Sequence, residues 1–394
     1  MSAARPKLLA LQFSEHHLQC TAFEADTLVR HEELTLYPSA TSALSRVSTW
    51  LEDQGNPPSR ILASATPRGR LLRLSSARGS PFAALSTQLA LPPGEEPVFT
   101  ACNAQNGDPS EVPGLFPRLL AAAPLDSLRT ARDTLANASL RAARLFDASY
   151  VQLGALTLAR ETMNTPVLVW DLGTDSSHFV LLDQRGILAV EFCPVGYNHI
   201  QAAIKAILGL RFATAATKLF VEGIYDFSDT GSKIARRFLP ELRECLTRLP
   251  VGPKHFHIIG LSHAQQWLTT AIAEGWCLQP LTVDWAAYGR AHGISFATRE
   301  LAASLPVSFG GLLLLAKHRD STAPSWQARW SDEPKPAPTP TPNSTPPVAP
   351  ASASAHPRRF RPVLDALAKV FTKPTAKKHP PHNPTTGKPS PRQT

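Results

Sequence analysis

The chain alternates short apolar runs with polar stretches, in lengths that suit short strands and helices. Apolar runs at 7–13, 18–23 and 28–36 are rich in residues that favour strands. They are followed by apolar positions with helical spacing at 42–53, and then by another apolar run at 60–65. This pattern predicts three strands, a helix and a fourth strand, and so it indicates an α/β fold.

A second series begins at residues 167–182, VLVWDLGTDSSHFVLL, where a polar turn joins two apolar runs. The pattern predicts a β-hairpin. The polar side chains and backbone N–H groups of such a turn can bind phosphate. A structural alternative needs no ligand, because Gly173 could serve only the backbone angles of the turn and Asp171 could only cap it. These residues alone leave both readings open.

After this hairpin, the sequence predicts a third strand at 186–192 and a helix at 199–208. The second half therefore opens with the same order of strand, strand, strand and helix as the first. Two halves that open alike indicate an internal duplication. At 394 residues, the chain is long enough for two domains or for one body with two lobes.

The formal net charge of +9 is concentrated near the C-terminus. Residues 356–394 contain nine Lys or Arg and one acid, whereas residues 1–355 contain 31 bases and 30 acids. A neutral body with a basic tail is not typical of a protein that binds the phosphate backbone of a nucleic acid in a basic groove. We therefore do not expect nucleic acid as a partner, and only the tail would offer it a binding surface.

The composition changes at about Trp330. Residues 331–357 are rich in Pro, Ala, Ser and Thr and predict an extended linker, and residues 374–394 are expected to be disordered. Between them, residues 358–373 predict a short basic amphipathic helix. This helix either docks on the body or frays, or it lies on an anionic membrane surface. The residues expected to contact the membrane are Arg358, Arg359, Phe360, Arg361, Val363, Leu364, Leu367, Lys369, Val370, Phe371 and Lys373.

Other features narrow the class of protein. The five cysteines are widely spaced without a CxxC pair, as is typical of a protein of the reducing cytoplasm. No apolar stretch reaches the ~20 residues that span a bilayer. His255 and His257 lie on one face of a predicted strand, but no third ligand is evident nearby, so we predict no metal site.

The order of elements and the glycine turns resemble the actin-like ATPase superfamily, in which two related lobes enclose ATP. Within it, most of residues 5–317 is similar to the PilM proteins of type IV pilus assembly and to the cytoplasmic domain of their type II secretion counterpart, GspL. The resemblance implies a duplicated, ribonuclease H-like actin-like ATPase fold with two lobes and a disordered C-terminal tail. We expect the first lobe at 1–165 and the second at 166–330.

The resemblance also implies the site. It places Asp171, Gly173 and Thr174 on the second phosphate-binding turn, where the carboxylate of the family orients magnesium-bound water. It places Gly260 on the adenosine loop, where one of three family glycines remains.

The first phosphate loop departs further from the family pattern, because Gln12 and Ser14 replace its Asp and Gly. We therefore expect ATP and Mg²⁺ to bind weakly or not at all, as in a pseudo-ATPase without catalytic residues. The alternative is an active actin-like ATPase or small-molecule kinase, in which Glu15 would supply the missing carboxylate.

The resemblance implies a function in assembly. PilM proteins are cytoplasmic scaffolds at the inner membrane that bind the cytoplasmic peptide of PilN, a membrane partner with one spanning helix. By this resemblance, the chain is expected to bind a PilN-like protein and other pilus or secretion components. The order of linker and amphipathic helix is similar to the C-terminal region of FtsA, a cell-division relative that holds the membrane with its helix.

Overall fold

The computed structural model describes residues 7–14, 16–37, 39–53, 58, 60–75, 85, 88, 91, 95–105, 117–140, 142, 145–159, 165–303 and 305. All of them belong to the first of two units of the chain, Met1–Trp330. Glu15 and the linker, amphipathic helix and basic tail predicted at 331–394 lie outside the described residues.

The first lobe is built on a six-stranded sheet with the order β14-β3-β2-β1-β4-β8. Its strands are β1 (Lys7–Phe13), β2 (His17–Glu24), β3 (Thr27–Thr35), β4 (Arg60–Ala65), β8 (Leu145–Asp147) and β14 (Ser295–Phe296). The first three strands form an antiparallel meander, and β4 and β8 continue the sheet in parallel from β1. The predicted strands of the first half are confirmed, with ends that differ by a residue.

The second lobe contains a five-stranded sheet with the order β11-β10-β9-β12-β13. Its strands are β9 (Val167–Asp171), β10 (Ser177–Asp183), β11 (Gly186–Cys193), β12 (His255–Ile259) and β13 (Gln279–Pro280). The strands β9, β10 and β11 are antiparallel neighbours, and β12 pairs in parallel with β9. The pairing of β1–β4 is thus repeated by β9–β12, which confirms the predicted duplication.

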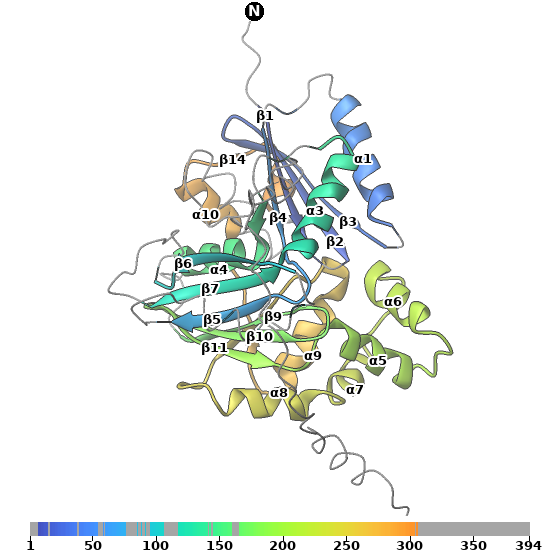
Figure 1. Cartoon of the computed structure of the whole chain (residues 1–394), viewed down its shortest axis with the longest axis vertical. Coiled ribbons are helices and arrows are strands. Elements are labelled where there is room, and N and C mark those ends of the chain that lie inside the picture. The colour runs from blue at the N-terminus through green and yellow to red at the C-terminus, as the bar shows by residue number, and fades with distance from the viewer. Residues whose placement is uncertain are drawn as a thin grey trace, which may run out of the picture. The chain divides into compact units, whose positions relative to one another are not determined.

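A third sheet inserts into the first lobe, with the antiparallel order β5-β7-β6. Its strands are β5 (Leu71–Ser75), β6 (Pro97–Asn103) and β7 (Arg118–Pro124). Strand β5 lies beside β11 of the second lobe (Figure 1). The backbone N–H of Ile187 also donates to the carbonyl of Ala104 at 2.7 Å, so this insertion contacts the second lobe directly.

The helices pack around these sheets (Figure 1). They are α1 (Ala40–Asp53), α3 (Leu125–Asn137), α4 (Ala148–Leu158), α5 (Tyr197–Ile207), α6 (Ala213–Glu222), α7 (Gly231–Ala235), α8 (Leu239–Leu246), α9 (Gln266–Gly275), α10 (Trp285–Ala291), α11 (Arg299–Ala303) and the 3₁₀ helix η2 (His263–Gln265). Helix α4 is buried from residue 148 to 157, because its small and apolar side chains pack against the core on every side. No helix in the described part of the chain is long and apolar enough to cross a membrane.

The alternation of side chains along β9 divides the core in two. Val167 and Val169 point into a core that they share with the first lobe and α4. Leu168 and Trp170 point to the opposite face, which α5 to α9 cover. The second lobe therefore has its own core and also extends that of the first.

The chain returns to the first lobe at its described end. Strand β14 pairs in parallel with β3, and Trp285 and Ile294 are buried in the core of the first lobe. This segment lies within the range 166–330 that we assigned to the second lobe from the sequence. The segment packs with the first lobe because burial of these apolar side chains against the first sheet is favourable.

Candidate functional site

A small cavity lies where β9 and β12 of the second lobe end opposite the turn between β4 and β5. Its volume is about 60 Å³. Five of the six residues predicted for the nucleotide site or its degenerate loop line it: Ser14, Asp171, Gly173, Thr174 and Gly260. The sixth, Gln12, is buried within β1 and does not line the cavity.

Asp171 ends β9 and is 1% exposed. One carboxylate oxygen, Oδ2, accepts a hydrogen bond from Nη2 of Arg70. The other, Oδ1, accepts from the hydroxyl of Ser149 at 2.5 Å. Both oxygens of the predicted phosphate-site carboxylate are therefore bonded to the protein itself.

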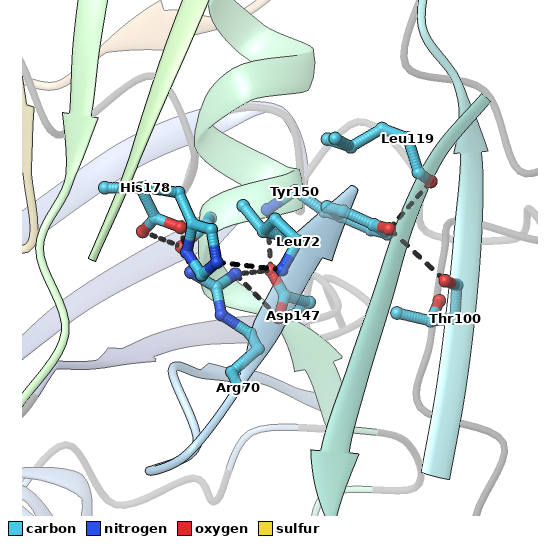
Figure 2. A network of polar contacts seen from close by, with 9 residues as sticks. Arg70, Leu72, Thr100, Leu119, Asp147, Tyr150 and His178 are labelled. Carbon is cyan, nitrogen blue, oxygen red and sulfur yellow. Dashed lines mark hydrogen bonds and ion pairs between the residues drawn. The ribbon is translucent and has the colours of Figure 1, made fainter. Parts of the chain in front are cut away.

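Arg70 lies in the turn before β5 and binds a second carboxylate, that of Asp147 (Figure 2). Its Nη1 donates to both oxygens of Asp147, at 2.8 and 3.0 Å. Asp147 also caps α4, because its Oδ1 accepts the backbone N–H of Tyr150 at 2.8 Å. One guanidinium thus joins the carboxylates at the ends of β8 and β9.

Burial and charge act together in this network. Burial opposes the charge of Arg70, but the carboxylates of Asp147 and Asp171 raise its pKa above the ordinary value. The guanidinium is therefore charged at every pH at which the protein is folded. Burial raises the pKa of Asp147, and Arg70 opposes that rise.

The turn after β9 is occupied by contacts with α5. The carbonyl of Gly173 accepts the N–H of Tyr197 at 2.9 Å, and the carbonyl of Thr174 accepts the N–H of Asn198 at 3.0 Å. Gly173 also has no room for a side chain, since an added Cβ would lie 2.3 Å from the carbonyl oxygen of Ser176. The turn therefore requires glycine whether or not a ligand is present.

The predicted adenosine loop is also in contact with protein. The hydroxyl of Tyr197 donates to the carbonyl of Gly260 at 2.7 Å. On the first-lobe side, the ring of His16 meets the ring of Tyr197 edge to face, with centroids 5.3 Å apart. The turn that carries Ser14 is tightened by the N–H of Ser14, which donates to the carbonyl of His17 at 2.9 Å.

A second polar contact joins the lobes outside the cavity. Oε2 of Glu33, on β3, accepts the backbone N–H of His263 at 2.8 Å, and Oε1 accepts from Gln19 at 3.3 Å. Burial raises the pKa of Glu33, and the hydrogen bond from His263 opposes that rise. Contacts within the protein thus join the two lobes both at the cavity and outside it.

Four residues of this site were not predicted from the sequence: Arg70, Asp147, Ser149 and His178. Asp147 carries a local signal, because an Asp before an apolar helix is a typical N-cap. His178 was within the predicted hairpin, but its role depends on β5: its Nε2 accepts the N–H of Leu72 at 3.1 Å (Figure 2). Arg70 lies 101 residues from Asp171 in the chain, and no local pattern predicts that pairing.

A magnesium nucleotide does not fit these residues. Arg70 already neutralises Asp171, and its guanidinium would repel a Mg²⁺ ion placed near this carboxylate. A cavity of about 60 Å³ is also far smaller than the roughly 300 Å³ at which ligand pockets begin. In the described part of the chain, no three His, Cys, Asp or Glu side chains are grouped as a metal would need, and His257 is buried within β12.

Comparison with known proteins identifies the fold but no sequence family. No protein-family model and no curated protein matches the sequence. Among solved structures, the chain is similar to a chain of the PilM-PilN type IV pilus biogenesis complex, with 16% identity and a TM-score of 0.55; the match covers 79% of this chain and 98% of that one.

Two further matches are weaker, with TM-scores below 0.5. They are the ethanolamine utilization protein EutJ from Carboxydothermus hydrogenoformans (12% identity, 80% of this chain and 92% of that chain, TM-score 0.38) and the cytoplasmic domain of EpsL, an inner membrane component of the type II secretion system of Vibrio cholerae (9%, 68% and 95%, 0.32). The repeated strand order and the first match together show that this chain has the actin-like ATPase fold, in a form similar to that of one chain of the PilM-PilN complex.

Proposed function

We propose that this protein is a cytoplasmic scaffold of a type IV pilus or type II secretion-like assembly at the inner membrane. In this role it binds the cytoplasmic peptide of a PilN-like membrane protein and does not work as an enzyme. The observation that carries the proposal is the fold match to a chain of the PilM-PilN complex, which spans 98% of that chain.

The cavity supports the part of the proposal that concerns ATP. Asp171, the carboxylate that would face magnesium, is paired with Arg70, and the cavity is too small for a nucleotide. The first phosphate loop also lacks its carboxylate, since Gln12 is at that position. In an active ATPase or kinase, Arg70 would have to give up its ion pair with Asp171 so that Asp171 could face magnesium. We therefore propose that ATP binding is weak or absent.

Partner binding is tested with the full chain. The probe is a fluorescent synthetic peptide that copies the cytoplasmic N-terminus of a PilN-like protein with one membrane-spanning helix from the same genome. We expect saturable binding in fluorescence anisotropy and no binding of a scrambled peptide of the same composition. Equal binding of the two peptides, or no binding of either, would contradict the proposal.

The basic segment 358–373 belongs to the same proposal, because an amphipathic helix would add membrane affinity to a protein recruited by its partner. Co-sedimentation with vesicles that contain anionic lipid tests it. We expect the full chain to bind such vesicles, with a loss of binding when residues 356–394 are removed or when salt is raised. Equal binding with and without the tail would refute a membrane role for it.

A further inference from the structure

One arginine bonds to carboxylates from both lobes. Asp147 ends β8 of the first sheet, and Asp171 ends β9 of the second. The guanidinium of Arg70 contacts both, and the side chains of all three residues are less than 5% exposed. No other salt bridge in the described part of the chain has both partners so deeply buried.

The two carboxylates need this partner. A buried carboxylate without a counter-charge is strongly destabilising, and removal of one member of a buried ion pair leaves such a charge behind. Ser149 and the N–H of Tyr150 supply one hydrogen bond each, but neither supplies a positive charge. Arg70 is the only cation within salt-bridge distance of either carboxylate among the described residues.

The segment that carries Arg70 is itself held in place. Gly69 has a φ of +69°, a left-handed conformation that favours glycine, and it directs the chain from the turn into β5. Two residues after Arg70, the N–H of Leu72 donates to the buried imidazole of His178 on β10. The arginine is thus positioned by its own turn and by a contact with the second lobe.

We propose that Arg70 is a permanent internal cation, which takes the position between the lobes that a magnesium nucleotide would need and holds the lobes closed without a ligand. This inference rests on the proposed absence of ATP binding and gives its structural cause. In such a protein, closure is a fixed property of the fold, and the partner peptide meets one conformation of the body whatever the nucleotide concentration.

Rescue by added cations tests the inference. In the full chain, Arg70→Ala should lower the melting temperature by roughly 10 °C, because two buried carboxylates lose their counter-charge. Millimolar guanidinium or Mg²⁺ should then raise the melting temperature of this variant but not that of the wild type. Arg129→Ala, which removes an exposed arginine paired with Asp126 on α3, is the control and should change neither property.

A double variant separates charge from packing. Adding Asp171→Asn to Arg70→Ala removes one of the two stranded charges, so the melting temperature should partly recover and the response to Mg²⁺ should fall. If Arg70 acted only by filling space, the added Asn would restore nothing and cations would rescue nothing, and the inference would be wrong. If Arg70→Ala does not fold, Arg70→Lys, which keeps the positive charge, should still fold with a lower melting temperature than the wild type, and a failure of this variant to fold would contradict the inference.

Hydrogen exchange tests the part of the inference that concerns the lobes. In the destabilised variant, exchange should rise both at 66–72 and at 167–178. A rise confined to 66–72 would mean that Arg70 stabilises only its own turn. Peptide binding is a separate readout: a failure to bind a PilN-like peptide, with the cation effects intact, would contradict the proposed function and leave this inference standing.

Discussion

Leu72 donates its backbone N–H to Nε2 of His178 across 3.1 Å, in the interior of the protein. The bond requires a neutral imidazole with its proton on Nδ1, since Nε2 accepts. It ties β5 of the inserted sheet to β10 of the second lobe, two residues from Arg70. Protonation of His178 would therefore break a contact next to the ion pairs of Arg70 with Asp147 and Asp171.

This contact predicts acid sensitivity. Burial lowers the pKa of His178 from 6.5 to about 4. As the pH falls through that window, the unfolded chain takes up a proton that the folded protein does not, so the free energy of unfolding falls. The loss from this residue should reach about 3 kcal/mol near pH 4 and then level off.

His178→Gln tests this prediction, because its amide can accept the same hydrogen bond without titrating. Urea unfolding between pH 7 and pH 4 should show a shallower pH dependence for this variant than for the wild type. His292→Gln, which changes an exposed histidine outside this network, is the control and should follow the wild type. A pH dependence unchanged by His178→Gln would show that another group causes the acid sensitivity.

Gly173 predicts a steric effect. The Cβ of Gly173→Ala would lie 2.3 Å from the carbonyl oxygen of Ser176, so the turn must deform and the free energy of unfolding should fall by about 2 kcal/mol or more. Gly252→Ala is the matched control, since nothing lies within 4 Å of its added Cβ, and it should be neutral within about 0.5 kcal/mol. Equal stability of the two variants in urea would contradict the described turn.

Ser149 predicts the cost of one lost hydrogen bond. Ser149→Ala removes the hydroxyl that donates to Oδ1 of Asp171 at 2.5 Å, and both residues are buried. Urea unfolding should therefore show a loss of about 1–3 kcal/mol. Ser127→Ala, which removes an exposed hydroxyl bonded to the carbonyl of Arg68, should cost much less. A negligible effect of Ser149→Ala would mean that Asp171 does not depend on this hydroxyl.

Much of the fold could be predicted from local patterns. The strand at 7–13 and the hairpin at 167–182 have their hydrophobic period and turn residues close together in sequence, so local patterns predict them. The repeated order of elements also predicted the duplication. The return of β14 to β3 could not be predicted, because a two-residue strand has no recognisable period and its partner is more than 250 residues away.

The site was predicted only in part, for the same reason. Asp171 and Gly173 could be identified because they are in one turn with a recognisable composition. The choice between a ligand and a structural role depends on Arg70 and Asp147, which reach Asp171 only through tertiary packing. Burial and pairing, and not the turn itself, decide what this carboxylate contacts.

The most direct test of the account is thermal unfolding of the full chain with and without Mg-ATP. A ligand at 100 times its Kd adds about 2.7 kcal/mol, which would raise the melting temperature by several degrees. Because Arg70 is ion-paired with Asp171 and the cavity is only about 60 Å³, we predict that millimolar Mg-ATP does not change the melting temperature. A magnesium-dependent rise that Asp171→Asn abolishes would show that the site binds nucleotide, and it would contradict the account.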